Sequence, residues 1–285
     1  GNNAGMLRAL ELGAQYIFLI NNDTWTAPDT VRLLVEQAEN APETGALAPK
    51  MLLFDAPQLL NSVGLDCSIS GSAWDRGVGR LDTPAWNRRV EVAGVCGGAC
   101  FLRADAVRAV GLLPESFGIY LDDLDLCLRI WAAGYTVETC PGAVVRHKFS
   151  ATMGSGKSAR RKYYLNTRNR FWLMLRNFPA RAFPRIAARV IQAECRALGR
   201  ALLDAEFWRA GAHVRAWCSA LAYLPSALLE RLRWRRLGFQ RERFWRLIRH
   251  DLLFCPRIEL PRNGWYAERR VHGRWMRPMS DAAWE

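Results

Sequence analysis

The first residues in the sequence with the chemistry of ligands are Asn21, Asn22 and Asp23. They follow residues 16–20, a continuous apolar run that favours β-structure. A carboxylate beside amide oxygens on a turn can bind a hard divalent cation, and the cation can then bind phosphate oxygens. The same residue types are ordinary turn residues and helix caps after a strand. Taken alone, the segment fits that structural role better.

Three carboxylates, those of Asp122, Asp123 and Asp125, lie within one turn of a predicted helix. Apolar residues from 124 to 131 recur at helical spacing, which places the acids at the helix N-terminus. The helix dipole offsets part of their mutual repulsion, and capping explains one or two of them. A bound cation or a catalytic role would explain the excess.

Two weaker candidates are a pair of glycines and a single histidine. Gly97-Gly98 lacks the spacing of a phosphate-binding loop, but it permits a ligand to lie against bare backbone. His147 ends a predicted strand, and a single histidine is more often structural than ligating. Together with Asp23 and the oxygens of a diphosphate, His147 would suit Mn²⁺ or Mg²⁺, with the histidine favouring Mn²⁺.

The elements that must position these residues alternate between helix and strand. The pattern predicts a short helix that ends near Gly13, a strand over 16–20, a helix after Pro28 and a strand over 47–54. This alternation predicts an α/β fold, and the continuous apolar strands favour a mostly parallel sheet. Ligands of such sheets bind beyond the carboxyl ends of the strands, where the Asn-Asn-Asp segment is placed.

The rest of the chain divides into an irregular excursion, further α/β elements and a helical region. Residues 61–90 are rich in Gly, Ser and Asp and predict a loop or hairpin. The elements predicted beyond it are a glycine-containing strand within 91–103, a helix over 104–110, strands over 135–139 and 143–146, and helices over 163–178, 184–203, 206–221 and 226–236. Trp265, Trp275 and Trp284 mark an aromatic tail.

The chain of 285 residues is half apolar and about one quarter charged, which is typical of a globular protein with a substantial core. The formal net charge of +13 is uneven, because residues 1–159 carry −4 and residues 160–285 carry +17. The second part therefore needs an anionic partner or a well-solvated basic surface. The longest apolar stretch, residues 220–229, is too short to span a bilayer.

The eight cysteines show no disulfide or zinc pattern. The sequence contains no CxxC pair and no Cys/His set with the spacing of a zinc site. Several of the cysteines lie in apolar runs, where Cys behaves as a small hydrophobic residue. We therefore expect reduced, mostly buried thiols and a cytoplasmic protein.

Six phrases of the sequence, read in order, resemble the bacterial family 2 glycosyltransferases, in particular the rhamnosyltransferase-like branch with the GT-A fold. The phrases are GNNAG, YIFLINNDT, GGACFLRADAV, FGIYLDDLDLCLRIWAAGY, PGAVVRH and YYLNTRNR, spread over roughly residues 1–175. The resemblance implies a Rossmann-like nucleotide-diphospho-sugar transferase fold. It implies an inverting, metal-dependent enzyme with a nucleoside-diphosphate sugar as donor. It also implies that the family's first strand–helix–strand unit is missing, so that the chain begins within the domain.

By this resemblance, Asn21, Asn22 and Asp23 occupy the position of the family's DxD-type motif and bind the donor. Asp23 would hold the divalent metal, Mn²⁺ or Mg²⁺, that bridges the diphosphate, and Asn21 would face the nucleotide sugar. His147 matches the position of a metal-ligating histidine in related enzymes.

By the same resemblance, Asp122 and Asp123 take the place of the family's Glu-Asp pair. Asp123 would be the general base that acts on an acceptor hydroxyl, and the shorter side chain of Asp122 leaves its acceptor contact open. An aspartate at a helix N-terminus is expected to stay ionised and to be a weak base, which suffices if proton transfer is late and the geometry is tight. Gly98 and Ala99 would line the donor–acceptor junction.

The predicted organisation has three parts: a GT-A catalytic domain over 1–157, basic amphipathic helices over 158–258 and an aromatic-rich tail over 259–285. The resemblance and the arginine-aromatic helices favour docking at the inner face of a bacterial plasma membrane. The acceptor there would be a glycan or lipid-linked glycan of cell-surface polysaccharide synthesis. A helical subdomain with a solvated arginine face explains the same pattern equally well.

Two other classes of function compete with a sugar transferase. A nucleic-acid-binding protein would explain the pI of about 9.9. The sequence has no RRM, KH or zinc-finger signature, and its basic residues avoid the half that carries the motifs, so no nucleic-acid partner is expected. A catalytically inactive transferase-like scaffold should have lost at least one of Asp23, Asp123 and His147, and all three are present.

Overall fold

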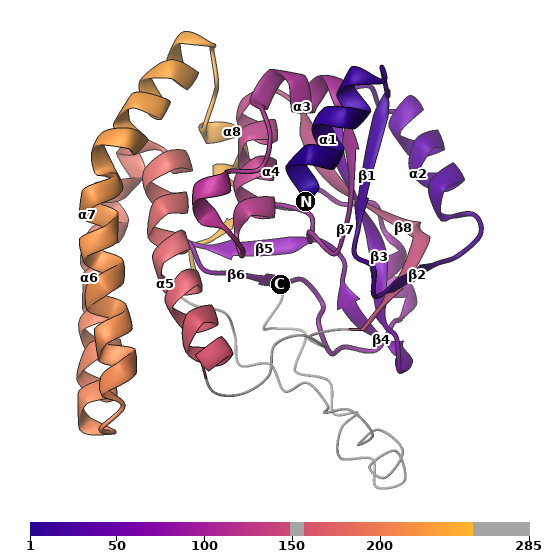
Figure 1. Ribbon diagram of the computed structural model, residues 1–285. Coiled ribbons are helices and arrows are strands. Elements are labelled where there is room, and N and C mark those ends of the chain that lie inside the picture. The colour runs from indigo at the N-terminus through magenta and orange to yellow at the C-terminus, as the bar shows by residue number, and fades with distance from the viewer. Residues whose placement is uncertain (149–156, 253–285) are drawn as a thin grey trace, which may run out of the picture.

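A computed structural model describes residues 1–148 and 157–252, in which a sheet flanked by helices lies beside three long helices (Figure 1). The first part contains α1 (Asn2–Glu11), β1 (Tyr16–Ile20), β2 (Thr24–Thr26), α2 (Thr30–Glu39), β3 (Thr44–Leu53), β4 (Ala56–Ser62), β5 (Leu65–Ser68), β6 (Ala73–Asp75), β7 (Ala99–Arg103), α3 (Ala104–Val110), α4 (Asp122–Ala132) and β8 (Thr136–His147). The second contains α5 (Lys157–Asn177), α6 (Phe183–Leu203), α7 (Phe207–Arg236), α8 (Glu242–Trp245) and β9 (Ile248–Arg249). The predicted α/β class is confirmed.

The main sheet has the strand order β1-β7-β3-β8-β2, with β4 added to β3. Strands β3 and β8 pair in parallel, whereas the other described pairings of this sheet are antiparallel. The prediction of a mostly parallel sheet is therefore wrong for the described strands. A continuous apolar run indicates burial on both faces of a strand, and a central antiparallel strand is buried in the same way.

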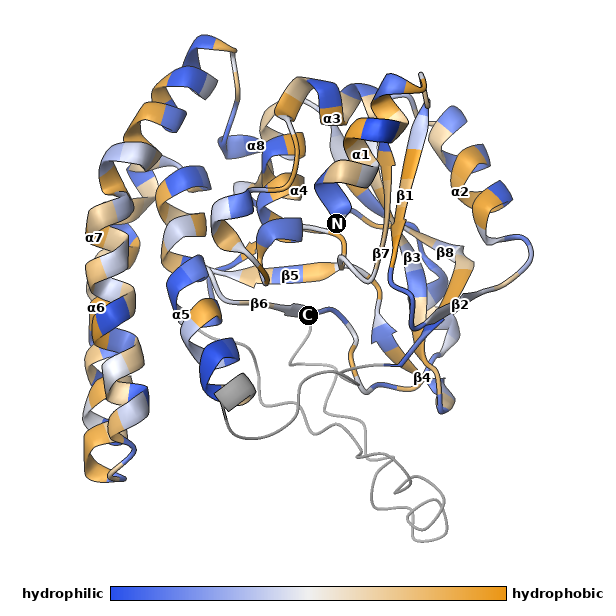
Figure 2. Cartoon of the chain, in the orientation of Figure 1, coloured by the Kyte–Doolittle hydropathy of each residue, from blue (hydrophilic) through white to orange (hydrophobic). Residues whose placement is uncertain are grey.

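Helices cover both faces of the main sheet. Helix α2 packs Leu34 and Ala38 against Leu47 of β3 on one face. Because side chains alternate along a strand, the neighbouring Ala46 and Ala48 belong to the larger cluster on the other face, to which α1, α3 and α4 contribute. The orange segments of these strands and helices mark the apolar residues from which this core is built (Figure 2).

Strand β8 is continuous where the sequence predicted two short strands. Its register against β3 shifts between Pro49 and Lys50, opposite the interval from Cys140 to Val144. The shift accommodates the residues that break the apolar pattern, and β8 continues through it to His147. The carboxyl end of β8, with His147, therefore lies at the same end of the sheet as the carboxyl end of β1.

A second sheet joins the excursion after β4 to the end of the helical region. Its order is β6-β5-β9, and β9 pairs in parallel with β5, with Cys67 opposite Ile248. The largest apolar cluster likewise includes Leu173 of α5 and Ile186 of α6 together with residues of α4. The helical region thus shares its core with the α/β part, and the predicted boundary at 157–158 stays a prediction.

Helix α7 runs without interruption through Pro225, where the sequence predicted two helices. A proline removes one intrahelical hydrogen bond and clashes with the preceding turn, so local reasoning ends a helix there. Packing along α5 offsets this penalty, since Trp172 stacks on Tyr223 at 4.2 Å between ring centroids and donates its indole N–H to the carbonyl of Ser219. Tertiary contact therefore overrides the local signal.

Glu194 of α6 joins the three long helices. Its buried carboxylate pairs with Arg170 of α5 and accepts hydrogen bonds from His213 and Trp217 of α7, at 2.9 and 3.0 Å. Burial alone would raise the pKa of Glu194, but the bond from His213 and the charge of Arg170 outweigh burial and lower it to about 2. The network fixes the relative placement of α5, α6 and α7.

Within residues 1–148 and 157–252, no helix is long and apolar enough to cross a membrane. The predicted aromatic tail over 259–285, with its three tryptophans, lies outside the described residues.

Candidate active site

The end of β1 meets the Gly97-Gly98 segment. The backbone N–H of Asn21 donates to the carbonyl of Gly98 at 3.0 Å. On the neighbouring strands Thr24 lies opposite His147, so the residue before Thr24 is brought to the histidine. Asp23 Oδ1 lies 3.3 Å from His147 Nε2, and Asn21 Nδ2 lies 3.4 Å from the same nitrogen. The two predicted metal ligands are therefore neighbours.

Asn61 of β4 orients the imidazole of His147. Its Oδ1 lies 2.7 Å from His147 Nδ1. With Asn61 Oδ1 as the acceptor, the imidazole proton is on Nδ1, which leaves Nε2 unprotonated beside Asp23 Oδ1 and Asn21 Nδ2. Such a partner on the far nitrogen is typical of a metal-ligating histidine. The sequence analysis did not find Asn61, since a single Asn within a strand carries no distinctive signal.

The pair formed by Asp23 and His147 fits a divalent cation. Asp23 Oδ1 is buried and makes no hydrogen bond to any described residue. Burial lowers the pKa of His147, against the opposing charge of Asp23, so a proton between the two groups is disfavoured. Two facing lone-pair donors need a positive charge between them, and a carboxylate with an imidazole suits Mn²⁺ or Mg²⁺.

Two protein ligands leave the other coordination positions to the donor. No group of three or more His, Cys, Asp or Glu side chains within the described part of the chain could hold a metal. Asp23 and His147 would therefore bind a metal weakly alone and more tightly when the oxygens of a diphosphate complete its shell. Such a site is suited to binding the metal together with a nucleotide.

Asp123 is held at the other side of the same glycine segment. Its Oδ2 accepts the backbone N–H of Gly97 and its Oδ1 accepts that of Leu124, both at 2.8 Å. A Cβ on Gly97 would lie 3.3 Å from the Asp123 carboxylate, and a Cβ on Gly98 would lie 3.5 Å from the ring of His147. Two consecutive glycines therefore touch the carboxylate on one side and the Asp–His pair on the other.

Burial raises the pKa values of the two acids at the start of α4. The pKa of Asp123 rises to about 6, although hydrogen bonds from Gly97 and Leu124 oppose the rise. The pKa of Asp122 rises to about 7, and the neighbouring Asp123 adds to this rise. Desolvation outweighs the helix dipole here, so Asp123 is a stronger base than an ordinary aspartate at a helix N-terminus. With a pKa of about 6, Asp123 is still mostly ionised at pH 7.

The loop that leads into Asp122 is held by Asn169 of α5. Its buried Nδ2 donates to the carbonyls of Phe117, Ile119 and Tyr120, at 3.1, 2.9 and 2.8 Å. Tyr120 also has a φ of 73°, in the left-handed region that non-glycine residues rarely adopt. Asn169 lies in the phrase YYLNTRNR, but nothing in that phrase indicated which loop it contacts.

Asp75 of β6 is a second buried acid that the sequence analysis missed. Burial raises its pKa, against hydrogen bonds from Ser62 and Cys96, and its charge contributes to the raised pKa of Asp123. It lies in the segment predicted as an irregular loop, where an isolated acid resembles a solvated turn residue. The structure adds it to the surroundings of the predicted base.

Three of the predicted donor residues differ in their placement. A Cβ on Gly98 would meet Met51, His147 and Asn21, so this glycine borders the pair formed by Asp23 and His147. Ala99 is fully buried, and its methyl packs with Met51 in a small cluster behind the site. Asn22 is exposed in the turn and makes no side-chain hydrogen bond to a described residue. Their roles toward a donor stay predictions.

Comparison with known families defines the class to which this fold and site belong. A sequence model of the family described as glycosyl transferase family group 2 matches residues 16–234, more than half of the chain. The chain therefore belongs to this family, and its enzyme class is that of a glycosyltransferase. The matched range contains all the predicted site residues and extends across the predicted boundary at 157–158.

More particular similarities are partial. Galactofuranosyltransferase GlfT1 of Mycolicibacterium smegmatis is 29% identical over 147 residues, which are 50% of this chain and 47% of that protein. The match spans about half the length of this curated relative. Among solved structures, GalNAc-T7 with UDP, GalNAc and Mn²⁺ has a TM-score of 0.39 and 13% identity, over 56% of this chain and 35% of that chain. The mannosyltransferase PcManGT of Pyrobaculum calidifontis, with GDP-Man and Mn²⁺, has a TM-score of 0.40 and 16% identity, over 81% and 66%.

Proposed function

We propose that this chain transfers a sugar from a nucleoside-diphosphate sugar to an acceptor hydroxyl, with inversion at the anomeric carbon. The observation that carries the proposal is the placement of Gly97 and Gly98 between Asp123 and the pair formed by Asp23 and His147. One side of this segment offers a base with a raised pKa, and the other offers ligands for a metal–diphosphate group. Neither glycine carries a side chain that would keep a sugar ring away from the backbone between them.

The proposed reaction is a single in-line displacement. The acceptor oxygen forms a bond to the anomeric carbon while the bond from that carbon to the diphosphate oxygen breaks. Asp123 takes the proton of the acceptor hydroxyl, and the hydrogen bonds from Gly97 and Leu124 fix its carboxylate for this task. Asp23 and His147 would hold the divalent cation, which when bound neutralises charge on the leaving diphosphate.

The donor sugar is proposed to be rhamnose, and galactofuranose is the alternative because of the relative named above. The acceptor is proposed to be a glycan or lipid-linked glycan of a bacterial cell surface. Docking at the inner face of the plasma membrane is supported by exposed apolar residues at the turn between α6 and α7, where Leu203 and Phe207 are 89% and 68% exposed.

A thermal-shift measurement tests this proposal. The chain is melted with UDP, dTDP or GDP, each with and without Mn²⁺, and compared with its Asp23→Ala variant. A nucleotide at about a hundred times its Kd stabilises a protein by about 2.7 kcal/mol, which raises the Tm by several degrees. We expect a Mn²⁺-dependent rise for one nucleotide, lost in Asp23→Ala.

The matched control is Asp29→Ala, which removes an exposed carboxylate paired with Arg32 at the start of α2. This variant should keep the nucleotide response of the unmodified chain. If a well-folded chain responds to none of the nucleotides, the transfer proposal is wrong and an inactive scaffold becomes the better explanation.

A further inference from the structure

A cavity of about 600 Å³ lies between α5 and α7, away from the site described above. We propose that this cavity binds a phosphate or diphosphate group, as a second anion site separate from the one that would hold the nucleotide sugar. The residues that line it are Arg160, Arg161, Tyr164, Leu165, Trp208, Gly211, Ala212 and Arg215. None of them is among the residues assigned to the donor, the metal or the base.

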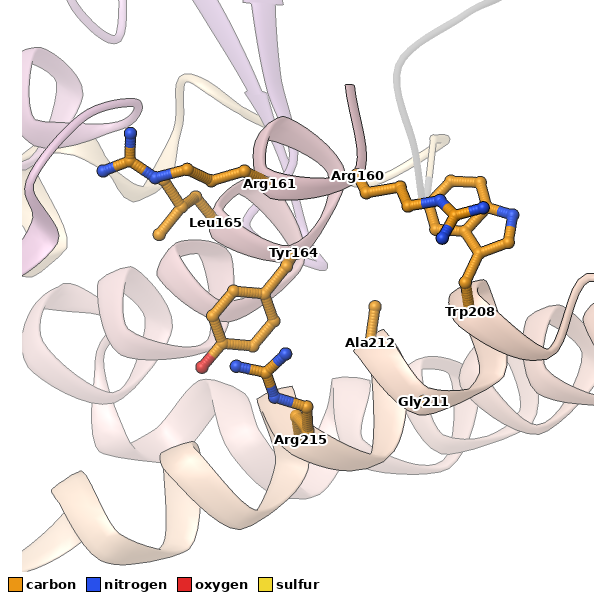
Figure 3. A pocket seen from close by; sticks show the side chains of 8 residues that line it. All are labelled: Arg160, Arg161, Tyr164, Leu165, Trp208, Gly211, Ala212 and Arg215. Carbon is orange, nitrogen blue, oxygen red and sulfur yellow. The ribbon is translucent and has the colours of Figure 1, made fainter. Parts of the chain in front are cut away.

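The cavity combines guanidinium groups with aromatic rings. Arg160 lies beside Trp208 and Arg215 beside Tyr164, with Ala212 between the two pairs (Figure 3). The guanidinium carbon of Arg160 is 5.4 Å from the indole centroid, and that of Arg215 is 4.4 Å from the ring of Tyr164. These cation–π contacts hold the arginines in place, so less side-chain freedom is lost when an anion binds.

Within the described part of the chain, no acidic side chain pairs with the arginines that line the cavity. Arg160, Arg161 and Arg215 form no ion pair or hydrogen bond with any residue that the structure describes. Arg209, the residue after Trp208, is instead paired with Glu206. The side chains of Arg160 and Arg215 flank Ala212 in the cavity, whereas that of Arg161 extends away from them (Figure 3). A multivalent anion would offset the positive charge that these side chains bring to the cavity.

Phosphate is the chemistry that such a cavity recognises best. Guanidinium groups form bidentate, charge-assisted hydrogen bonds with phosphate oxygens. The volume is within the usual range of small-molecule sites and exceeds what a single phosphate fills, which favours a diphosphate or a phosphate with an attached group. A Cβ placed on Gly211 would meet no atom within 4 Å, so the floor of the cavity is open to such a group.

The walls of the cavity are rigid enough to keep this shape. Tyr163, beside Tyr164 on α5, lies with its hydroxyl 2.8 Å from His213 Nε2 of α7. His213 in turn binds Glu194, the carboxylate that joins the three long helices. The two helices that carry the arginines are therefore fixed relative to each other before any ligand binds.

Calorimetric titration with inorganic pyrophosphate tests the site. The titration uses the full chain with the Asp23→Ala substitution, in EDTA and at low salt. Binding of pyrophosphate at the metal site of the donor then does not contribute to the measured heat. We expect saturable binding that weakens about tenfold or more when Arg160→Ala and Arg215→Ala are added, because each removes a charge-assisted contact.

The matched control is Arg196→Ala with Arg200→Ala, which removes the same charge from the exposed face of α6, outside the cavity. It should change the affinity less than twofold. The proposal is overturned if the chain does not bind pyrophosphate saturably, or if both pairs of substitutions weaken binding equally. Melting curves confirm that each variant is folded.

Vesicles separate the two sources of phosphate. Sedimentation with phosphatidylglycerol vesicles, compared with phosphatidylcholine vesicles, is measured for the same variants. If the cavity variant loses binding to the anionic vesicles and the control variant does not, the ligand is a lipid headgroup. If the cavity variant loses pyrophosphate binding but binds vesicles as the unmodified chain does, the ligand is a free phosphate or diphosphate. Neither result depends on nucleotide binding at Asp23, so failure of the transfer proposal leaves this test intact.

Discussion

The helical region and the start of α4 differ in the partners of their buried carboxylates. In the helical region buried carboxylates have guanidinium partners, as Glu194 has Arg170, and the pKa of Glu194 lies at about 2. At the start of α4 the carboxylate of Asp123 accepts hydrogen bonds from backbone N–H groups, and the neighbouring group of Asp122 is another acid. Burial raises the pKa values of Asp122 and Asp123 to about 7 and about 6. Paired charge holds the fold together, and unpaired charge marks the place where a ligand is expected.

The contrast is sharpest within one helix turn. Asp125, two residues after Asp123, is fully buried and forms ion pairs with Arg129 at 2.9 Å and Arg176 at 3.0 Å. The helix therefore turns one aspartate toward the arginines and another toward the glycine segment. Replacing each by its amide should separate a structural effect from a catalytic one.

The largest effect is expected from Asp123→Asn. Loss of the general base should lower the transfer rate by about 10²–10⁴-fold, because the acceptor proton has no positioned group to take it. The Tm should change by only a few degrees, since an amide still fills the space. Initial rates of sugar transfer and circular dichroism melts measure the two quantities.

The control for this variant is Asp105→Asn on the exposed side of α3, which should leave the rate unchanged. A rate in Asp123→Asn within tenfold of the unmodified chain would remove Asp123 from the role of base.

The reverse pattern is expected from Asp125→Asn. The substitution leaves the buried guanidinium of Arg129 without its carboxylate and Arg176 with only that of Glu230. The single amide oxygen that remains can replace only part of the hydrogen bonds that the carboxylate accepts from Arg129 and Asn177. Breaking a buried ion pair from one side typically costs about 3–5 kcal/mol. Urea unfolding should show this loss of stability, with the nucleotide response retained at temperatures where the variant is folded. Equal stability of the two amide variants would abolish the distinction between the two aspartates.

A third change tests the clamp on the loop that precedes the acids. Asn169→Ala removes the side-chain donor of the Ile119 and Tyr120 carbonyls, whereas the carbonyl of Phe117 keeps its bond from Arg168. This loss should cost about 1–3 kcal/mol of stability. We also expect about a tenfold lower kcat with a smaller change in KM, because the loop that leads into the start of α4 loses a hydrogen-bond partner and places Asp123 less accurately.

Asn166→Ala is the matched control for the clamp, since Asn166 on the same helix donates only to the carbonyl of Lys162 within α5. If kcat falls equally in both variants, Asn169 is a stabilising residue of α5 and not a positioning residue.

The local elements were largely predictable from the sequence, because they depend on patterns within a few residues. The strand β1 over 16–20, the helix from Ala104 to Gly111 and the acids at the start of α4 follow from apolar spacing and from the glycine. Strand direction was not predictable in the same way, since alternation and burial look alike in parallel and antiparallel sheets. Pro225 led to the prediction of two helices for a related reason, because packing of α7 against α5 outweighs the local effect of the proline.

The missed site residues share one property, which is that their partners lie far away in the chain. Asn61 contacts His147 and Asn169 contacts the loop before Asp122, at separations of 86 and about 50 residues. Each is a single polar residue in an otherwise ordinary strand or helix. Its function comes from the tertiary fold, whereas Asp23 and Asp123 were found because they lie in dense polar clusters at element ends.

The smallest expected effect is a shift in pH dependence. Asp123 acts when ionised, so the transfer rate should fall as pH drops through its raised pKa, by about tenfold per unit well below pH 6. Burial is the main cause of that raised pKa, and the charge of Asp75 adds to it. Asp75→Asn should therefore move the inflection of the kcat–pH profile to lower pH, by less than about one unit.

The profile of Asp105→Asn should overlay that of the unmodified chain, because this exposed carboxylate pairs with Arg108 on α3. An inflection that stays in place in Asp75→Asn would mean that burial alone sets the pKa of Asp123. An inflection that moves to higher pH would mean that Asp75 is protonated and stabilises the ionised base by donating a hydrogen bond. Either result would define how the unpaired acids of this site differ from the paired acids of the helices.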